Sequence, residues 1–165
     1  MRINMKQSIY LDTTIPSYYY DERESLKNYI DATHSWWDNE SCLYELFTSE
    51  YVVAELEKGE YPNQDLILEM MKNIPTLELT PEIVEIAEAY MKEYVMPKGA
   101  AGDAFHLACA SYHKIDYLLT WNCNHLANAN KTKHICIVNT KLGLFTPQLV
   151  TPIQLFKESD DDTTD

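Results

Sequence analysis

Short apolar runs alternate with longer segments of helical periodicity along the chain. Runs rich in branched and aromatic residues predict strands at residues 8–12, 44–48, 76–79, 117–120 and 135–139. Apolar residues at three and four spacing predict helices between them, one ending near Asn39, one after Pro62 and one beginning at Pro81. We expect residues 144–155 to form a final loop with a short helix or edge element. Such alternation is typical of a three-layer α/β/α sandwich around a mostly parallel sheet.

The length and composition of the chain predict one folded domain with a polar end. The chain has 165 residues, of which 45% are apolar, so we expect a single domain over residues 1–157. Residues 158–165 contain five acidic and no basic residues, which predicts a solvated, disordered tail. Removing this tail would change the formal net charge from −13 to −8, so the body is acidic as well.

Apolar runs and cysteine spacing bear on where the protein acts. The first apolar run ends after five residues, too early for a secretory signal, and we expect no membrane-spanning segment. The four cysteines show no CxxC pair, which is typical of reduced thiols rather than disulfides. These features predict a cytoplasmic protein.

Three acidic residues stand at places where an α/β sheet builds sites. Asp12 follows the first predicted strand, Glu55 lies in a helical run on the same face as apolar neighbours, and Asp103 opens another helical run. Each alone is consistent with a turn, a solvated charge or a first-turn acid. Together they predict a site for Mg²⁺ or Mn²⁺, which prefer carboxylate oxygens. We expect Thr13 to hold the carboxylate or the backbone of Asp12 by a hydroxyl hydrogen bond. Thr120, at the end of a later strand, is expected to support in the same way the polar cluster that follows it.

Four segments in this order resemble the PIN-domain nucleases: SIYLDTTIPSYYYD, SEYVVAELEKG, GDAFHLACA and YLLTWNCNHLAN. The resemblance covers about residues 8–140 and is greatest to the VapC-like branch. It implies a PIN-like fold and a Mg²⁺- or Mn²⁺-dependent endoribonuclease that hydrolyses RNA phosphodiester bonds as the toxin of a toxin–antitoxin pair. It further implies an antitoxin partner and a homodimer. The metal ligands would be Asp12, Glu55 and Asp103, and the same three with Asn122 would be the catalytic residues.

Two residues in these segments leave the function open. Relatives often carry an aspartate where this chain has Asn122, and a neutral oxygen binds a hard cation more weakly than a carboxylate does. The alternative is therefore a catalytically weak PIN module that binds RNA or a protein partner. His106, one turn after Asp103, resembles the histidine of a D-A-x-H-x-A pattern, but a packed helix histidine fits equally well, and we do not assign it to catalysis.

Two other kinds of site are less well supported by the sequence. A tetrahedral zinc site from Cys123, His125, His134 and Cys136 would have the right ligand types, but the spacing matches no common zinc motif, and the last two residues read equally well as part of a strand. A phosphatase with Asp12 as nucleophile would need a second aspartate at the position of Thr14.

The acidity of the chain is unfavourable for binding RNA, because phosphate affinity comes chiefly from lysine and arginine. Basic residues that could offset it at the rim of the site are Arg23, Lys27, Lys58 and Lys98. The run Tyr18 to Tyr20 offers rings for stacking on bases, although ordinary packing within a helix is the favoured interpretation for at least one of the three.

Overall fold

A five-stranded parallel sheet forms the centre of the molecule in the computed structural model, which describes residues 5–156. The strand order is β3-β2-β1-β4-β5 and every pairing is parallel. The strands are β1 (Ser8–Leu11), β2 (Glu45–Ser49), β3 (Thr76–Leu77), β4 (Tyr117–Leu119) and β5 (Gln148–Val150). The α/β fold predicted from the sequence is confirmed. The acidic segment 158–165 lies outside the described residues.

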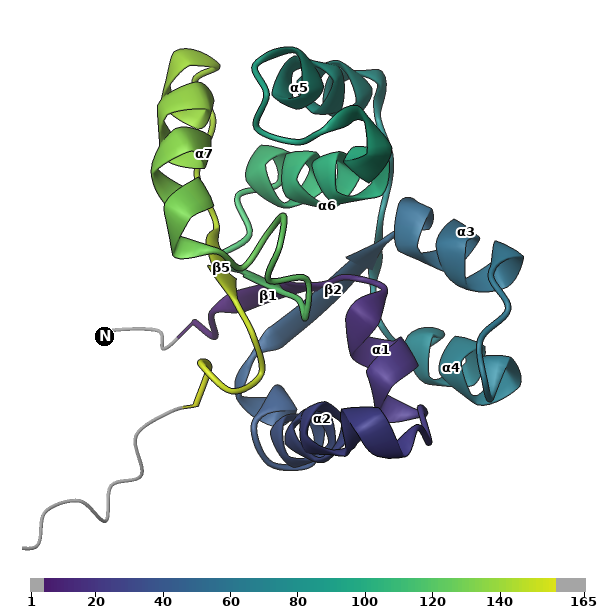
Figure 1. The fold of residues 1–165 in the computed structure, drawn as a ribbon. Coiled ribbons are helices and arrows are strands. Elements are labelled where there is room, and N and C mark those ends of the chain that lie inside the picture. Colours follow the sequence, from purple (N-terminus) through teal and green to yellow (C-terminus); the bar gives the residue numbers. More distant parts are fainter. Residues whose placement is uncertain (1–4, 157–165) are drawn as a thin grey trace, which may run out of the picture.

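Helices cover the sheet in two groups. They are α1 (Thr14–Tyr19), α2 (Lys27–Asn39), α3 (Glu50–Lys58), α4 (Gln64–Met71), α5 (Pro81–Lys92), α6 (Ala101–Tyr112) and α7 (Ala129–Lys141). Figure 1 shows α5, α6 and α7 on one side of the sheet and α1 and α2 on the other, with α3 and α4 beside each other. Short 3-10 turns at Glu24–Leu26, Ser41–Leu43 and Lys98–Ala100 precede or follow these helices. The described elements thus form the predicted layers around a central sheet.

The order of the strands places a topological switch point between β1 and β4. From β1 the chain proceeds outward to β2 and β3, and it then returns across the sheet to β4 and β5 on the other side of β1. The connections that follow β1 and β4 run on opposite faces of the sheet (Figure 1). The carboxyl ends of two such neighbouring strands are where open α/β sheets usually bind ligands. Asp12 and Thr120 are the first residues after these two strands.

The core lies around β1, which is buried on both faces. Ile9, Tyr10 and Leu11 have no exposed surface, as expected for a central parallel strand. The strand is therefore rigidly held up to the residue before Asp12. Tyr10 is the polar exception in this run, and its hydroxyl is considered below.

The strand predicted at residues 135–139 is wrong, because this segment lies within α7. Asn128 caps that helix by accepting a hydrogen bond from the backbone N–H of Asn130. Ile135, Val138 and Asn139 are buried at helical spacing, while Ile137 is 47% exposed. The branched residues gave the run the composition of a strand, but the pattern of burial is that of a helix.

The remaining predicted elements are confirmed with small shifts at their ends. The fifth strand is β5, at the edge of the sheet and within the segment 144–155 for which we expected a loop with a short helix or an edge element. Within the described range, no helix is long and apolar enough to cross a membrane.

Candidate functional site

Asp12 is a buried carboxylate with both oxygens hydrogen-bonded. Its Oδ1 accepts hydrogen bonds from the backbone N–H and the hydroxyl of Thr14, and its Oδ2 accepts one from the hydroxyl of Thr120. The residue is 1% exposed. Burial raises the pKa of Asp12 above its usual value, although nearby His106 and the hydroxyl hydrogen bonds favour the charged form. The end of β1 therefore holds a fixed carboxylate whose charge is only partly compensated.

The polar segment after β4 links Asp12 to Asp103. Thr120 Oγ1 accepts a hydrogen bond of 2.9 Å from the backbone N–H of Asn122, whose side-chain Nδ2 donates to Asp103 Oδ2 over 2.8 Å. Asn122 Oδ1 accepts from the backbone N–H groups of Asn124 and His125, at 3.1 and 3.0 Å. Asn122 thus lies at the predicted site, but its carbonyl oxygen is already occupied by the backbone.

Glu55 reaches the site from α3. Its Oε1 accepts hydrogen bonds from the hydroxyl of Thr13, at 2.8 Å, and from Nε2 of His106, at 2.9 Å. We expected Thr13 to contact Asp12, the preceding residue, and the structure instead directs its hydroxyl to Glu55. Burial acts to raise the pKa of Glu55, but the contacts with His106 and Thr13 outweigh it and lower the pKa below its usual value.

His106 is the residue of this network that sequence reasoning did not assign. It lies on α6, one turn after Asp103, and is 3% exposed. Its Nδ1 lies 2.8 Å from the hydroxyl of Tyr10, opposite the nitrogen that contacts Glu55. Burial acts to lower the pKa of His106, but the hydrogen bond to Glu55 and the charges of Asp12, Glu55 and Asp103 raise it overall. The signal was its spacing from Asp103 on the same helix.

Asp103 completes the acidic group at the start of α6. Burial raises its pKa and Glu55 adds to this rise, while His106, His125 and Asn122 act in the opposite sense. A Cβ atom added at Gly102 would lie 3.5 Å from Glu55 Oε2, so the start of α6 lies against that carboxylate. The six predicted site residues lie in two hydrogen-bonded groups. Asp12, Thr120, Asn122 and Asp103 form one group, and Thr13 and Glu55 form the other with His106. The two groups lie close together, because the charges of Asp12 and Asp103 also raise the pKa of His106.

The donor set suits a hard divalent cation. Glu55 Oε2 and Asp103 Oδ1 accept no hydrogen bond from any residue in the described range. Within that range, no three His, Cys, Asp or Glu side chains stand close enough together to form a preformed metal cluster. Mg²⁺ usually keeps several waters and takes only one or two carboxylates directly, and these two oxygens are of the type that it takes.

The zinc alternative is not supported by the arrangement of its four residues. His134 and Cys136 lie on α7, not on a strand, and Cys123 and Cys136 are both exposed. A structural zinc site needs four ligands in contact with the ion. The described residues contain no cluster of this kind.

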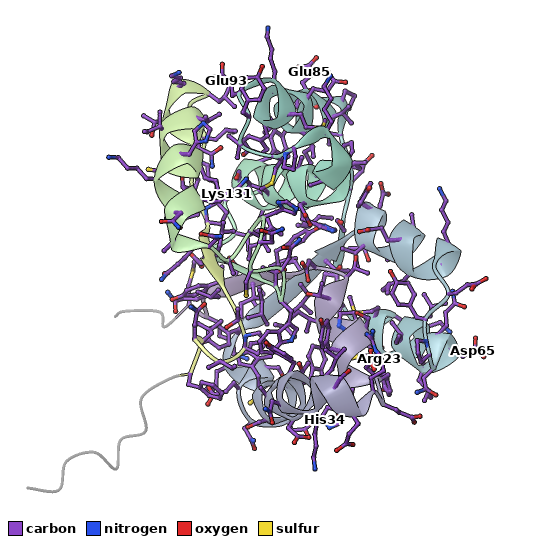
Figure 2. All side chains as sticks on the ribbon, viewed as in Figure 1. Arg23, His34, Asp65, Glu85, Glu93 and Lys131 are labelled. Atoms are coloured by element: carbon purple, nitrogen blue, oxygen red, sulfur yellow. The ribbon has the colours of Figure 1, made fainter. Side chains whose placement is uncertain are left out.

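Some of the basic and aromatic residues that we expected near the site contact other residues instead. Arg23, labelled in Figure 2, donates from Nε and Nη2 to the carboxylate of Asp21, with a shortest distance of 2.6 Å. Its charge is thereby paired within its own turn. The ring centre of Tyr18 lies 6.1 Å from that of Trp121, and the ring centre of Tyr19 lies 4.3 Å from that of His34. These rings contribute to packing, as the favoured interpretation of the tyrosine run expects.

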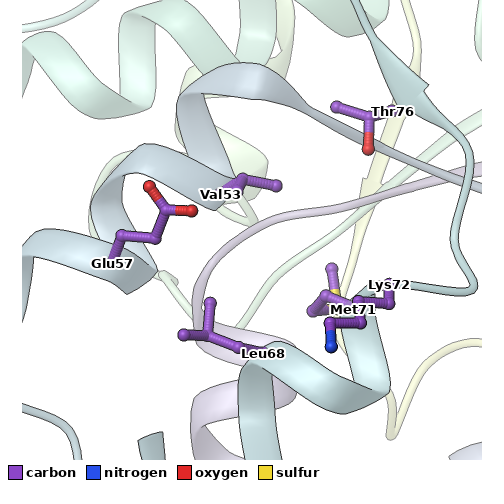
Figure 3. A pocket seen from close by; sticks show the side chains of 6 residues that line it. All are labelled: Val53, Glu57, Leu68, Met71, Lys72 and Thr76. Atoms are coloured by element: carbon purple, nitrogen blue, oxygen red, sulfur yellow. The ribbon is translucent and has the colours of Figure 1, made fainter. Parts of the chain in front are cut away.

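A separate groove lies between α3 and α4. This hollow of about 300 Å³ is lined by Val53, Glu57, Leu68, Met71, Lys72 and Thr76 (Figure 3). Val53 and Glu57 are two residues from Glu55 on either side, and therefore project from the opposite face of α3. The groove and the acidic network thus use different faces of one helix.

The fold and the acidic network define an α/β domain with a carboxylate site at the switch point of its sheet. The chain belongs to the PIN domain family, whose model matches residues 9–124. A search among proteins with curated descriptions finds no match.

Solved structures of VapC toxins share this fold. The VapC20 toxin of Mycobacterium tuberculosis, which cleaves the sarcin-ricin loop, is 10% identical with a TM-score of 0.56, over 71% of this chain and 92% of that one. VapBC-1 of nontypeable Haemophilus influenzae is 17% identical with a TM-score of 0.55, over 89% and 99% of the two chains. A toxin–antitoxin complex from Klebsiella pneumoniae is 19% identical with a TM-score of 0.50, over 87% and 97%.

Proposed function

We propose that this protein is a Mg²⁺- or Mn²⁺-dependent endoribonuclease that acts in the cytoplasm as the toxin of a toxin–antitoxin pair. The observation that carries the proposal is the convergence of Asp12, Glu55 and Asp103: Thr120 and Asn122 link Asp12 to Asp103 by hydrogen bonds, and all three carboxylates lie near enough to His106 to raise its pKa. Membership of the PIN domain family and the shared fold of VapC toxins support the same function.

The proposed chemistry follows from the carboxylates and their neighbours. Asp12, Glu55 and Asp103 would hold the ion, which would supply a polarised water and neutralise charge on the RNA phosphate. Thr14 and Thr120 fix Asp12, because they donate to its two oxygens. Burial raises the pKa values of Asp12 and Asp103 because it disfavours their charged forms, and a bound cation would stabilise those forms.

The proposed partners are RNA as substrate, an antitoxin protein and a second copy of the chain. The similar structure from Haemophilus influenzae is that of VapBC-1, and the one from Klebsiella pneumoniae is a toxin–antitoxin complex. The formal charge of −13 suits a basic partner segment more than it suits free RNA. A basic antitoxin is therefore the partner that the electrostatics favour.

One observation favours the alternative of a catalytically weak PIN module that binds RNA or a protein partner. Asn122 stands where relatives often carry an aspartate, its amide nitrogen donates to Asp103, and its carbonyl oxygen accepts from two backbone N–H groups. The residue thus adds neither a charge nor a free oxygen to the site. Lower affinity for the ion is the expected consequence.

Cleavage of a labelled pool of cellular RNA tests the two proposals. The purified full-length protein is compared with Asp103→Asn in EDTA, Mg²⁺ and Mn²⁺, and Asp31→Asn, an exposed change on α2, is the matched control. The nuclease proposal expects metal-dependent cutting that Asp103→Asn abolishes and Asp31→Asn retains. Folded protein, free of a bound inhibitor, that cuts with neither ion would refute it and favour the binding module.

A further inference from the structure

A line of four side chains runs from the sheet to the Glu55 carboxylate. Ser49 Oγ lies 2.7 Å from the hydroxyl of Tyr10, that hydroxyl lies 2.8 Å from His106 Nδ1, and His106 Nε2 lies 2.9 Å from Glu55 Oε1. Ser49 and Tyr10 are fully buried and His106 is 3% exposed. Ser49 also caps α3, the helix that carries Glu55, by accepting from the N–H of Val52. Both ends of the line are therefore tied to α3.

When His106 is neutral, the donors and acceptors along this line fit one another in only one order. Since the Glu55 carboxylate has no proton to donate, His106 Nε2 must carry one. Ser49 Oγ already accepts from Val52, so its own proton can go to Tyr10, and the proton of Tyr10 then goes to Nδ1 of a neutral His106. Ser49, Tyr10 and His106 then each donate once and accept once, which fixes the plane and the tautomer of the neutral imidazole.

Packing alone does not require the hydroxyl of Tyr10. Its neighbours on β1, Ile9 and Leu11, are apolar, and a phenylalanine would fill the same buried space without a polar group to satisfy. The hydroxyl has two partners, Ser49 and His106, in the described part of the chain. We infer that Tyr10 is a positioning residue, which orients His106 and through it holds the Glu55 carboxylate in place. This inference rests on the proposed nuclease function.

The change Tyr10→Phe removes only the hydroxyl, and Tyr90→Phe is its matched control. Tyr90 is also fully buried, and its hydroxyl also has two partners, Asn139 at 2.6 Å and Ser111 at 3.1 Å, but these do not belong to the acidic network. We expect Tyr10→Phe to lower the affinity for Mn²⁺, measured by calorimetry, by about tenfold. The turnover number for RNA cleavage should fall by about the same factor, with KM for RNA unchanged. Tyr90→Phe should change neither. Equal effects of the two variants would overturn the inference.

A double-mutant cycle tests whether Tyr10 acts through His106. In His106→Gln the glutamine Nε2 can still donate to Glu55, but the contact with Tyr10 is lost. If Tyr10 acts through the imidazole, Tyr10→Phe should have no further effect on Mn²⁺ affinity in the His106→Gln background. Additive effects of the two changes would contradict the inference.

A spectroscopic readout separates this inference from the proposed function. In the ion-free protein, at a pH where the imidazole is neutral, ¹⁵N chemical shifts should show the His106 proton on Nε2. Tyr10→Phe should move them toward a mixture of tautomers, whereas Tyr90→Phe should not. Wild-type protein that neither binds Mn²⁺ nor cuts RNA would refute the nuclease, and the ¹⁵N shifts would still decide the role of Tyr10. Unchanged shifts in Tyr10→Phe would refute that role.

Discussion

The side-chain amide of Asn122 donates a hydrogen bond to Oδ2 of Asp103 over 2.8 Å. A neutral donor therefore occupies the place beside Asp103 where an aspartate would repel it. The contact stabilises the charged form of Asp103, whose pKa is nonetheless raised because burial is the larger effect. In the absence of an ion, the charges at this site therefore repel one another less than they would with an aspartate at position 122.

Asn122→Asp should lower the stability of the ion-free protein and raise its affinity for the ion. The new carboxylate can still accept from the backbone N–H groups of Asn124 and His125, but it loses the hydrogen bond to Asp103 and repels it. We expect about 1–3 kcal/mol lower stability in EDTA and tighter Mn²⁺ binding. Thermal unfolding with and without Mn²⁺ measures both.

The matched control for this change is Asn124→Asp, which adds the same charge at an exposed amide two residues away. It should leave stability in EDTA within about 0.5 kcal/mol of the wild type, as is usual for surface substitutions. If the two variants lost the same stability in EDTA, the contact between Asn122 and Asp103 would not stabilise the ion-free protein.

Thr120→Val should lower the activity by more than its loss of stability alone would cause. The buried Thr120 hydroxyl donates to Asp12 and accepts from the backbone N–H of Asn122, so valine leaves two groups without a partner. Thr33→Val is the control, because the Thr33 hydroxyl is equally buried and also makes two hydrogen bonds, to the Tyr29 carbonyl and from Trp121. Each change should cost about 1–3 kcal/mol.

Only Thr120→Val should also lower the rate of RNA cleavage, by about 10–100-fold, because it frees one oxygen of Asp12. The comparison is made in single-turnover assays at a temperature where both variants are folded. Equal rates for the two variants would show that Thr120 supports the fold alone.

The acidic site could be predicted from the sequence because its residues lie at element ends that are visible as local patterns. Asp12 follows an unbroken apolar run, and Asp103 opens a helix with clear periodicity. In a parallel sheet the carboxyl ends of neighbouring strands meet at one edge, so residues far apart in sequence were expected to converge. The hydrogen bonds among Asp12, Thr120, Asn122 and Asp103 agree with this expectation.

Contacts that depend on side-chain direction could not be predicted in the same way. Whether His106 packs in the core or contacts Glu55 depends on how α3 and α6 cross, and local spacing contains no information on that crossing. The helix α7 was mistaken for a strand because branched residues at 135, 137 and 138 suit both structures, and only burial against the neighbouring elements separates them.

Asp21 should account for part of the loss of stability in acid. Its hydrogen bonds with Arg23 are the largest influence and lower the pKa of Asp21, although burial opposes them. A carboxyl with a lowered folded pKa contributes stability that is present above the unfolded pKa, about 3.9, and is lost as the pH falls through the folded value. Asp21→Asn should therefore lose less stability than the wild type below about pH 4.

Urea unfolding at several pH values between neutral and acidic conditions measures this difference. Asp31→Asn on α2, an exposed carboxylate, serves as the control and should follow the wild-type curve. Parallel curves for Asp21→Asn and the wild type in acid would mean that the contact between Asp21 and Arg23 does not stabilise the folded state.

Asp103→Asn should stabilise the ion-free protein while it abolishes cleavage. The folded pKa of Asp103 is raised, mainly by burial, so the folded state loses stability as the pH rises through that value and the carboxyl ionises. An asparagine stays neutral and its carbonyl can still accept from Asn122. We expect a gain of about 0.5–2 kcal/mol near neutral pH, which corresponds to about 2–4 °C in Tm for each kcal/mol.

Addition of Mn²⁺ should reverse the order of the two proteins. A ligand that binds only the folded state raises Tm, so the wild type should gain with increasing Mn²⁺ while Asp103→Asn, which lacks one of the proposed ligands, gains less. Calorimetric unfolding in EDTA and in Mn²⁺ tests both parts. A variant less stable than the wild type in EDTA would show that the charged form of Asp103 is held by favourable contacts. The cost of burying that charge would then not explain why the site binds a cation.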